Sequence, residues 1–278
     1  MFVIKKIQIE LFIFAILLIS ILLTYKIDVG VYTFFAKFNY GSGSVYLKNF
    51  FVGITNLGNS FWYFAIFILV FLITYFTKKI NLVPLDKYSY FNKIGFFGFA
   101  YLFLVGATTQ IIKHFVGRPR PNHSQLDGGF EFNFFTTESA FHSFPSGHSS
   151  TIVAITIIAS LILPGLRYFF YLCGFFIALS RVVVGAHFIT DVIAGAIIAV
   201  ITYKVFDFLV KKKCPKIYWG DLEIYKTSIL TKTLIIFFVL AIFLTIGPEI
   251  DIFISNLFYY GNNQFLIQSY YFISILFR

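Results

Sequence analysis

The chain alternates between long apolar runs, most of them close to twenty residues, and short polar stretches. Runs of about twenty apolar residues are long enough to cross the hydrocarbon core of a bilayer as helices. The pattern therefore predicts an all-α, polytopic membrane helical bundle. We place seven spans at residues 7–25, 61–77, 94–112, 149–163, 168–185, 188–210 and 229–246. The fourth run is short, so we expect it to begin its first turn within residues 146–148.

The first run has two interpretations. Lys5 and Lys6 precede an apolar stretch, as in a secretory signal peptide. No small-residue cleavage site follows that stretch, and the chain continues with Tyr25 and Lys26. We therefore interpret the first run as a retained membrane span.

Two shorter segments carry apolar residues on one helical face only. They follow the first and the last predicted spans, and both begin with Ile-Asp and an aliphatic residue, at positions 27–29 and 250–252. Amphipathic helices of this kind lie in the membrane interface. We expect both segments to cap the outer membrane surface, and a role in admitting substrate is the alternative.

Composition narrows the class of protein. The chain is 59% hydrophobic and 12% charged, and its mean hydropathy is +0.84, whereas a soluble domain carries about 25% charged residues. This excludes a soluble cytosolic protein and a disordered chain. The 22 basic and 12 acidic residues give a net charge of +10. They stand singly or in short groups between apolar runs rather than along a polar face, which argues against nucleic-acid binding.

The distribution of basic residues predicts the orientation of the spans. Most lysines fall in alternate loops, and the positive-inside rule assigns those loops to the cytoplasm. The N-terminus is then cytoplasmic and the C-terminus lies outside. The basic residues left on the outer face are Lys26, Lys37, Lys48, Lys113, Arg118, Arg120, Arg181 and Arg278.

The polar chemistry is concentrated in three segments on that outer face, at residues 113–121, 145–148 and 180–191. Each segment adjoins a predicted span. Ionisable side chains are costly beside the hydrocarbon core of a membrane and are usually functional there. The three segments are therefore the candidates for an active or binding site.

The basic residues of these segments predict an anion site. Lys113, Arg120 and Arg181 have no equal set of acids beside them in the sequence, and arginine binds phosphate through paired N–H donors. The Pro-Ser-Gly-His sequence begins a helix and offers free backbone N–H groups. Ser146 can cap that helix, and Gly147 lets an anion approach closely. Together these residues predict a phosphate site.

Two histidines and an acid add reactive groups. His187 and Asp191 are four residues apart, hence on one helical face, where a carboxylate can fix the imidazole tautomer and leave the other nitrogen nucleophilic or basic. His148 belongs to another span and can donate a proton to a leaving oxygen. Each motif alone is more often a structural cap or hydrogen bond. In combination, on one face, they favour covalent phosphoryl transfer, with a bell-shaped dependence of rate on pH.

A metal site is the other option for the histidines, because His142, His148 and His187 are all candidates for the outer face. Three neighbouring cations would repel a divalent ion, and no cluster of acids is present to ligate it. We therefore predict no metal and no other cofactor.

At this point the chain resembles the type-2 phosphatidic-acid phosphatase superfamily of membrane lipid phosphatases. That family carries Lys-x6-Arg-Pro, Pro-Ser-Gly-His and Ser-Arg-x5-His-x3-Asp, and every position of the three motifs is matched within residues 113–191. The resemblance implies a metal-independent phosphatase with a six-span core over residues 1–210. A cytoplasmic loop over 211–228 and an additional span with an outer-face tail over 229–278 lie outside that core.

The resemblance also implies a role for each motif residue. His187 is the phosphorylated nucleophile, Asp191 orients it, and His148 protonates the leaving group before water hydrolyses the phosphohistidine. Arg118, in the variable part of the first motif, is a candidate for substrate contact. The implied phosphate-binding residues are Lys113, Arg120, Ser146, Gly147 and Arg181.

The implied substrate is a lipid phosphate or diphosphate of the bacterial envelope, with the bilayer as the other partner. The loop over residues 122–144 joins two motifs and is expected to select the head group. Its sequence resembles bacterial members acting on envelope lipids: lipid A is favoured, followed by undecaprenyl diphosphate and phosphatidylglycerol phosphate. The implied location is the inner membrane with the site facing the periplasm. A phosphotransferase and a non-catalytic lipid-binding or transport relative are the alternatives, and the oligomeric state stays open.

Overall fold

The computed structural model describes residues 25–40, 45–79, 85–124, 131–213, 259–261 and 264–265. Most of them are helical. The helices are α2 (Tyr25–Tyr40), α3 (Val45–Thr55), α4 (Ser60–Lys79), α5 (Leu85–Val116), α6 (Gly147–Ile162), α7 (Arg167–Val183) and α8 (Ile189–Lys213). Four 3-10 turns are η1 (Asn56–Gly58), η2 (Pro121–His123), η3 (Ser139–Phe141) and η4 (Pro164–Leu166). Strands β1 (Tyr259–Gly261) and β2 (Gln264–Phe265) pair in antiparallel fashion.

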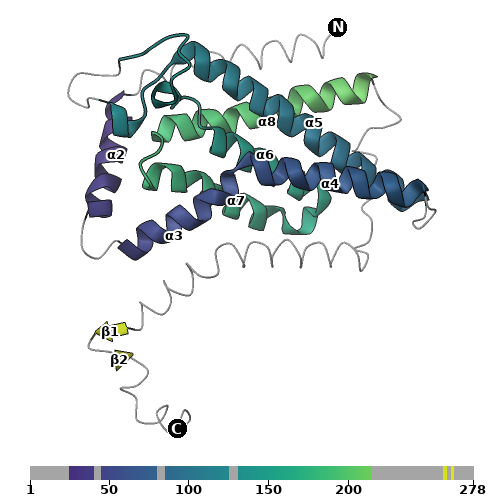
Figure 1. Ribbon diagram of the computed structural model, residues 1–278, viewed down its shortest axis with the longest axis horizontal. Coiled ribbons are helices and arrows are strands. Elements are labelled where there is room, and N and C mark those ends of the chain that lie inside the picture. Colours follow the sequence, from purple (N-terminus) through teal and green to yellow (C-terminus); the bar gives the residue numbers. More distant parts are fainter. Residues whose placement is uncertain are drawn as a thin grey trace.

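The long helices α4 to α8 run lengthwise beside one another, and α2 stands across one end of this bundle (Figure 1). Helix α6 is central, since it contacts α5, α7 and α8. Apolar side chains from these helices form one core cluster, in which Tyr101, Val105 and Ala199 are completely or almost completely buried. The Tyr101 hydroxyl donates to the Ala199 carbonyl at 2.8 Å, so its one polar atom is satisfied within the core.

All five predicted spans that fall within the described residues are helices in the structure. Four helical stretches are long and apolar enough to cross a membrane; they are Lys48–Thr77, Tyr90–His123, Pro164–Val183 and Ile189–Lys212. Helix α6 is apolar but has only 16 residues. The chain is thus a multi-pass helical membrane protein. The span predicted at 229–246, and the one at 7–25 apart from its last residue, lie outside the described residues, so the count of six or seven spans stays a prediction.

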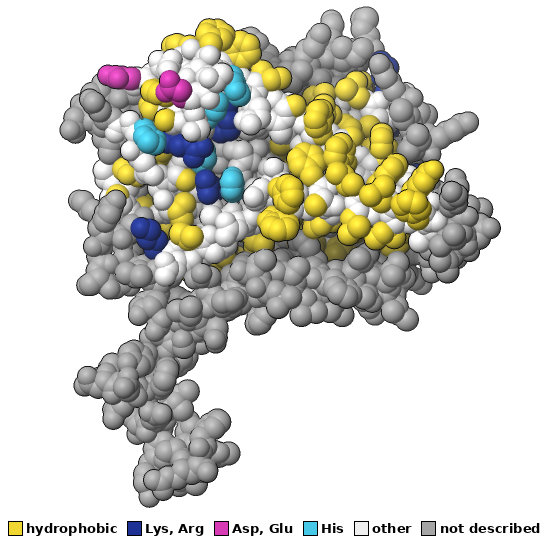
Figure 2. Space-filling model, in the orientation of Figure 1, with side chains coloured by type: hydrophobic (Ala, Val, Ile, Leu, Met, Phe, Trp, Pro, Cys, Tyr) yellow, Lys and Arg dark blue, Asp and Glu magenta, His cyan; other side chains and the backbone are white. Residues whose placement is uncertain are grey.

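The surface of the bundle divides into an apolar and a polar part. Large apolar side chains such as Phe61, Phe103 and Phe175 are more than half exposed, which suits a surface facing lipid rather than water. Figure 2 shows apolar side chains spread over α4 and α5, whereas lysine, arginine and histidine side chains gather near the end where α5 stops. We call this the polar end.

Two glycines turn the chain at the polar end. Gly117 follows α5 with φ of 56°, and its N–H donates to the Lys113 carbonyl at 3.0 Å. A Cβ there would lie 1.6 Å from the Asn133 carbonyl oxygen. Gly185 follows α7 with φ of 71°. Positive φ is where glycine is favoured, so both turns depend on it, and they stop α5 and α7 immediately before residues of the site.

Helix α2 confirms the amphipathic helix predicted after the first span, but its packing adds a feature that the sequence did not predict. Ile27 and Phe34 are 58% and 59% exposed, whereas Asp28 is completely buried. Val31 and Phe35 pack against the core cluster. The helix therefore presents an acid to the protein interior in addition to covering a surface. The second amphipathic segment, predicted to begin at residues 250–252, lies outside the described residues.

Candidate active site

Three cations meet at the polar end, and we call them the cation cluster: Lys113 near the end of α5, Arg120 in the following loop, and Arg181 in the last turn of α7. Each donates to a neutral acceptor: Lys113 Nζ to the His142 carbonyl (2.8 Å), Arg120 Nε to the Ser139 carbonyl (3.0 Å) and Arg181 Nη1 to Thr55 Oγ1 (2.9 Å). Among the described residues, no carboxylate lies within ion-pair distance of any of the three. The buried Arg181 Nε has no hydrogen-bond partner in that same part of the chain. The cluster therefore has unused capacity to bind an anion.

The start of α6 lies beside this cluster. Ser146 is the N-cap, and its Oγ accepts from the Ser149 N–H at 3.3 Å. Gly147 and His148 are the first two residues of the helix, where backbone N–H groups have no acceptor within the helix itself. A Cβ on Gly147 would lie 3.8 Å from Lys113 Cε, so the lysine side chain passes close to these N–H groups. Helix starts of this kind favour negatively charged groups.

His187 lies in the turn between α7 and α8 and is 2% exposed. Its Nδ1 donates to the Ser143 carbonyl oxygen at 2.8 Å, so the neutral ring carries its lone pair on Nε2. Asp191 Oδ2 lies 3.6 Å from Nδ1, which is longer than a hydrogen bond. The structure therefore places a backbone carbonyl where the sequence predicted Asp191 to orient the ring, and Asp191 contributes as a charge at ion-pair distance.

Both histidines are surrounded in ways that favour the neutral ring. Burial lowers the pKa of His187 to about 3; Asp191 opposes this effect, while Lys113 and Arg181 add to it. Burial, and then the three cations, lower the pKa of His148 to about 4. A neutral His187 is ready to act as a nucleophile, but His148 needs a proton to act as an acid. A phosphate dianion in the cation cluster would offset its charge and raise the pKa of His148.

The corner between α3 and α4 completes the surroundings of His148. A Cβ on Gly58, in η1, would lie 2.9 Å from His148 Cβ, so only glycine lets this corner pack against the histidine. Thr55, at the end of α3, is the partner of Arg181. Sequence reasoning assigned no role to either residue, because nothing in their local pattern distinguishes them from an ordinary turn.

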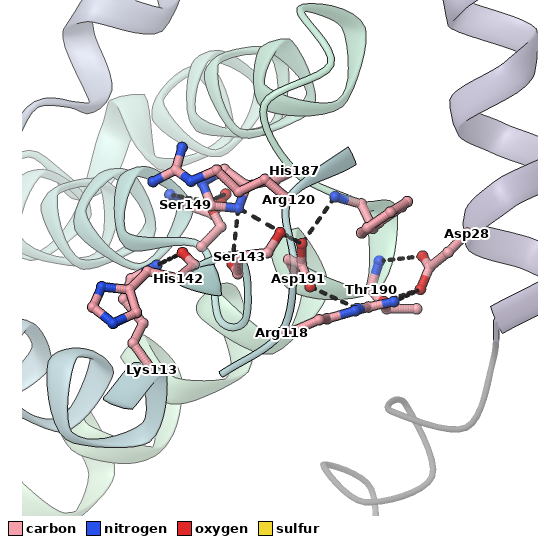
Figure 3. A network of polar contacts seen from close by, with 12 residues as sticks. Asp28, Lys113, Arg118, Arg120, His142, Ser143, Ser149, His187, Thr190 and Asp191 are labelled. Carbon is pink, nitrogen blue, oxygen red and sulfur yellow. Dashed lines mark hydrogen bonds and ion pairs between the residues drawn. The ribbon is translucent and has the colours of Figure 1, made fainter. Parts of the chain in front are cut away.

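Asp191 is the third residue of α8 and is completely buried. Its Oδ1 accepts from Arg118 Nη1 at 2.6 Å, and its Oδ2 accepts from Ser143 Oγ at 2.5 Å and from the Phe188 N–H at 2.9 Å (Figure 3). The bond to Phe188 has the geometry of a capping box, in which an acid at the third helical position reaches back to the N-cap. Asp191 is thus fixed by three donors, and a fourth group, His187, lies close by.

Arg118 occupies a different place from the one expected. The sequence suggested a substrate contact, but the side chain is completely buried and bridges two carboxylates. One is Asp191, and the other is Asp28 from α2, at 2.5 Å from Arg118 Nη2. The sequence pattern did not lead us to predict Asp28 as a site residue. The signal that could have indicated it is a lone acid on an otherwise apolar helix face.

Two kinds of sequence comparison bear on this site. Residues 95–214, which contain all three motifs, match the family model of the PAP2 superfamily. Lipid A 1-phosphatases of Rhizobium etli and Rhizobium johnstonii are each 36% identical to this chain over 144 residues, or 51% of it. The matched region covers 62% and 59% of those relatives, so the chain spans about three fifths of the length of the curated relatives that it matches.

A solved structure shares the fold. The crystal structure of a transmembrane PAP2-type phosphatidylglycerolphosphate phosphatase from Bacillus subtilis aligns with a TM-score of 0.52 and 23% sequence identity. The alignment covers 75% of this chain and 97% of the other. At this level of identity the likeness concerns the arrangement of the helices.

Proposed function

We propose that the chain is an integral membrane phosphatase of the PAP2 superfamily that removes phosphate from a lipid phosphate. The match of residues 95–214 to the model of that family supports the assignment. The observation that carries the proposal is the meeting of a buried neutral imidazole, His187, with three cations that have no acid paired to them among the described residues. A phosphate group would supply the missing negative charge, and His187 would supply the nucleophile.

Lipid A is the favoured substrate. Its support is the similarity to the two Rhizobium proteins, which are lipid A 1-phosphatases. Undecaprenyl diphosphate and phosphatidylglycerol phosphate rank next. All three present a phosphate at the membrane surface, where a site at one end of a helical bundle can reach it without extracting the lipid.

The first chemical step forms a bond between His187 Nε2 and phosphorus and breaks the bond from phosphorus to the lipid oxygen. Nε2 is the attacking atom because Nδ1 is held by the Ser143 carbonyl. Lys113, Arg120 and Arg181 neutralise the charge on the phosphoryl oxygens, together with the N–H groups at the start of α6. His148 gives its proton to the departing lipid oxygen, which leaves as an alcohol or a phosphate.

The second step returns the enzyme to its starting state. Water attacks phosphorus, the bond to Nε2 breaks, and His148 takes the proton that the water loses. Asp191 stabilises the positive charge that His187 carries as a phosphohistidine. Apart from water, every group in these two steps belongs to the chain or the substrate, so the proposed reaction uses no metal.

We further propose that the protein lies in the bacterial inner membrane with its site on the periplasmic side. The support is the distribution of lysines, which the positive-inside rule places in loops on the opposite side from the three motifs. We propose the same three parts of the chain as the sequence predicts. They are a six-span core over residues 1–210, a cytoplasmic loop over 211–228, and an additional span with an outer-face tail over 229–278.

Phosphate release from purified protein, with EDTA present, tests the function. The panel comprises lipid A, undecaprenyl diphosphate, phosphatidylglycerol phosphate and phosphatidic acid, each with the wild type, His187→Ala and a control, Tyr168→Ala, whose side chain is 70% exposed at the start of α7. We expect one lipid to be preferred, activity to survive in EDTA and in the control, and His187→Ala to abolish it. A strict requirement for a divalent metal would overturn the mechanism. Phosphate appearing only on an added acceptor lipid or sugar would identify a phosphotransferase.

A further inference from the structure

Arg118 joins two acids that come from distant parts of the chain. Its Nη1 donates to Asp191 Oδ1 at 2.6 Å, and its Nη2 to Asp28 Oδ2 at 2.5 Å. Asp28 and Asp191 are more than 160 residues apart in the sequence and lie on α2 and α8. All three side chains have no exposed surface. Charges removed from water in this way are stable only when their partners are accurately placed, so each of the three restricts where the other two can lie.

Thr190 connects the same groups a second time. Its N–H donates to Asp28 Oδ1 at 3.1 Å, and its hydroxyl donates to Asp28 Oδ2 while accepting from Arg118 Nη1 at 2.8 Å. Thr190 is the second residue of α8, where the backbone N–H has no partner within the helix. The carboxylate of α2 therefore caps the helix that carries Asp191. We call Asp28, Arg118, Thr190 and Asp191 the Arg118 centre.

The turn that carries the nucleophile is packed into the same centre. The Arg118 guanidinium carbon lies 4.6 Å from the centroid of the Phe188 ring, and the Phe188 N–H donates to Asp191. The Phe188 ring also meets Tyr32 of α2 edge to face, at 6.2 Å between centroids. Asp28 and Tyr32 are one helical turn apart and share one face of α2. That face therefore both caps α8, through Asp28, and contacts Phe188, the residue next to His187.

We propose that Arg118 and Asp28 are positioning residues for catalysis. Asp28 holds the guanidinium of Arg118, and Arg118 fixes Asp191 Oδ1, which leaves Oδ2 directed at Ser143 and His187. Helix α2 is then part of the catalytic apparatus in addition to covering the membrane surface. This inference rests on the proposed phosphatase function, in which Asp191 stabilises the charged state of His187.

Kinetics of matched variants test the proposal. Asp28→Asn keeps the shape of the side chain and an oxygen that can accept from the Thr190 N–H, but it removes the charge that faces Arg118. Arg118→Lys keeps the charge but cannot reach both acids in a fixed plane. We expect each variant to lower kcat about 10-fold to 100-fold, as for small displacements of reacting groups, with little change in KM. The control is Asp207→Asn, about 25 Å further along α8 at 1.5 Å per residue, which should retain wild-type kcat.

A second set of variants separates positioning from plain structural support. If Asp28 acts through Asp191, then Asp28→Asn should cause no further loss of kcat in an Asp191→Asn background. The same fractional loss in both backgrounds would show that Asp28 acts independently, and this would overturn the proposal. Wild-type kcat in folded Asp28→Asn protein would overturn it as well. Should Asp28→Asn fail to fold, Asp28→Glu and Arg118→Lys serve the same comparison.

A readout without turnover keeps this test distinct from that of the proposed function. The ¹⁵N chemical shifts of the His187 ring report its tautomer and its charged neighbours. We expect them to change in Asp28→Asn and to stay unchanged in Asp207→Asn. A wild type that releases no phosphate but shows this pattern would contradict only the proposed function. An active wild type, with neither kcat nor the His187 shifts altered in Asp28→Asn, would contradict only the positioning role.

Discussion

The polar end of the bundle holds two sets of basic side chains that differ in their partners. In the cation cluster, Lys113, Arg120 and Arg181 donate to carbonyl and hydroxyl oxygens, none of which carries a negative charge. In the Arg118 centre, one guanidinium lies between two carboxylates and is fully buried with them. The first set carries an excess of positive charge and the second an excess of negative charge.

This difference indicates that the two sets have different roles: the cation cluster is suited to binding a ligand, and the Arg118 centre to holding other residues in position. A cation without an acid attracts an anionic ligand, whereas a cation already held by two acids has its charge satisfied by the protein. Both sets act on His187: Lys113 and Arg181 lower its pKa, and Asp191 raises it. An arginine in a motif region is therefore not by itself evidence of substrate contact, and its acidic neighbours in the fold decide its role.

The largest effect should come from removing the charge of the Arg118 centre. Arg118→Met leaves Asp28 and Asp191 buried without their common partner, and breaking a buried ion pair in this way costs about 3–5 kcal/mol. The expected result is a clearly lower midpoint of thermal unfolding in detergent. Arg181→Met is the matched control, and it should unfold near the wild-type midpoint. Equal unfolding midpoints for Arg118→Met and Arg181→Met would show that the ion pairs of Arg118 matter no more to stability than the contacts of the cation cluster.

The same Arg181→Met variant should show the opposite behaviour in kinetics. In the proposed mechanism Arg181 neutralises charge that develops on the phosphoryl group, and loss of one such donor lowers kcat about 10²-fold to 10³-fold. Binding of inorganic phosphate, followed by calorimetry, should weaken in Arg181→Met and stay close to wild type in Arg118→Lys. If phosphate binding weakened equally in Arg181→Met and Arg118→Lys, Arg118 would have to be counted with the phosphate-binding residues of the cation cluster.

A smaller effect is expected from the corner that packs against His148. Gly58→Ala puts a methyl group 2.9 Å from His148 Cβ, so either the histidine or the corner must shift from its present position. We expect kcat to fall about 10-fold, within the range for a misplaced catalytic group. The control is Gly30→Ala, since a Cβ on Gly30 of α2 meets no atom within 4 Å. A kcat for Gly58→Ala equal to that of the control would show that His148 does not need its present position.

The smallest change is a shift in the pKa of His148. In the free protein this pKa is lowered to about 4 by burial and by the cation cluster. Bound phosphate offsets the cations and should raise this pKa, so phosphate binding takes up a proton. Binding should therefore strengthen as pH falls through the raised pKa towards the free value of about 4. An NMR titration of labelled His148, with and without phosphate, measures the shift, and exposed His123 is the internal control. A pKa that stays low with phosphate bound would argue against His148 as the proton donor.

The sequence predicted the parts of the molecule that depend on local pattern. Apolar runs gave the helices α4 to α8 to within a few residues at most ends, and motif spacing gave the residues of the cation cluster and both histidines. Nothing in the pattern indicated that Asp28 would meet Arg118, because that contact depends on how α2 packs across the end of the bundle. The place of Arg118 depends in turn on the positive φ of Gly117, which ends α5 one residue earlier. Ser143 contributes a backbone carbonyl to His187, and a backbone group leaves no signature in a sequence.

The central claim is that His187 receives the phosphoryl group. The direct measurement is to mix the enzyme with lipid phosphate labelled in the phosphate, quench within the first turnover under alkaline conditions that preserve phosphohistidine, and map the label by mass spectrometry. We predict a single labelled peptide with the phosphoryl group on His187, formed in EDTA and absent from His187→Ala. Phosphate release by the wild type without any label on His187, or with the label on another residue, would contradict the account.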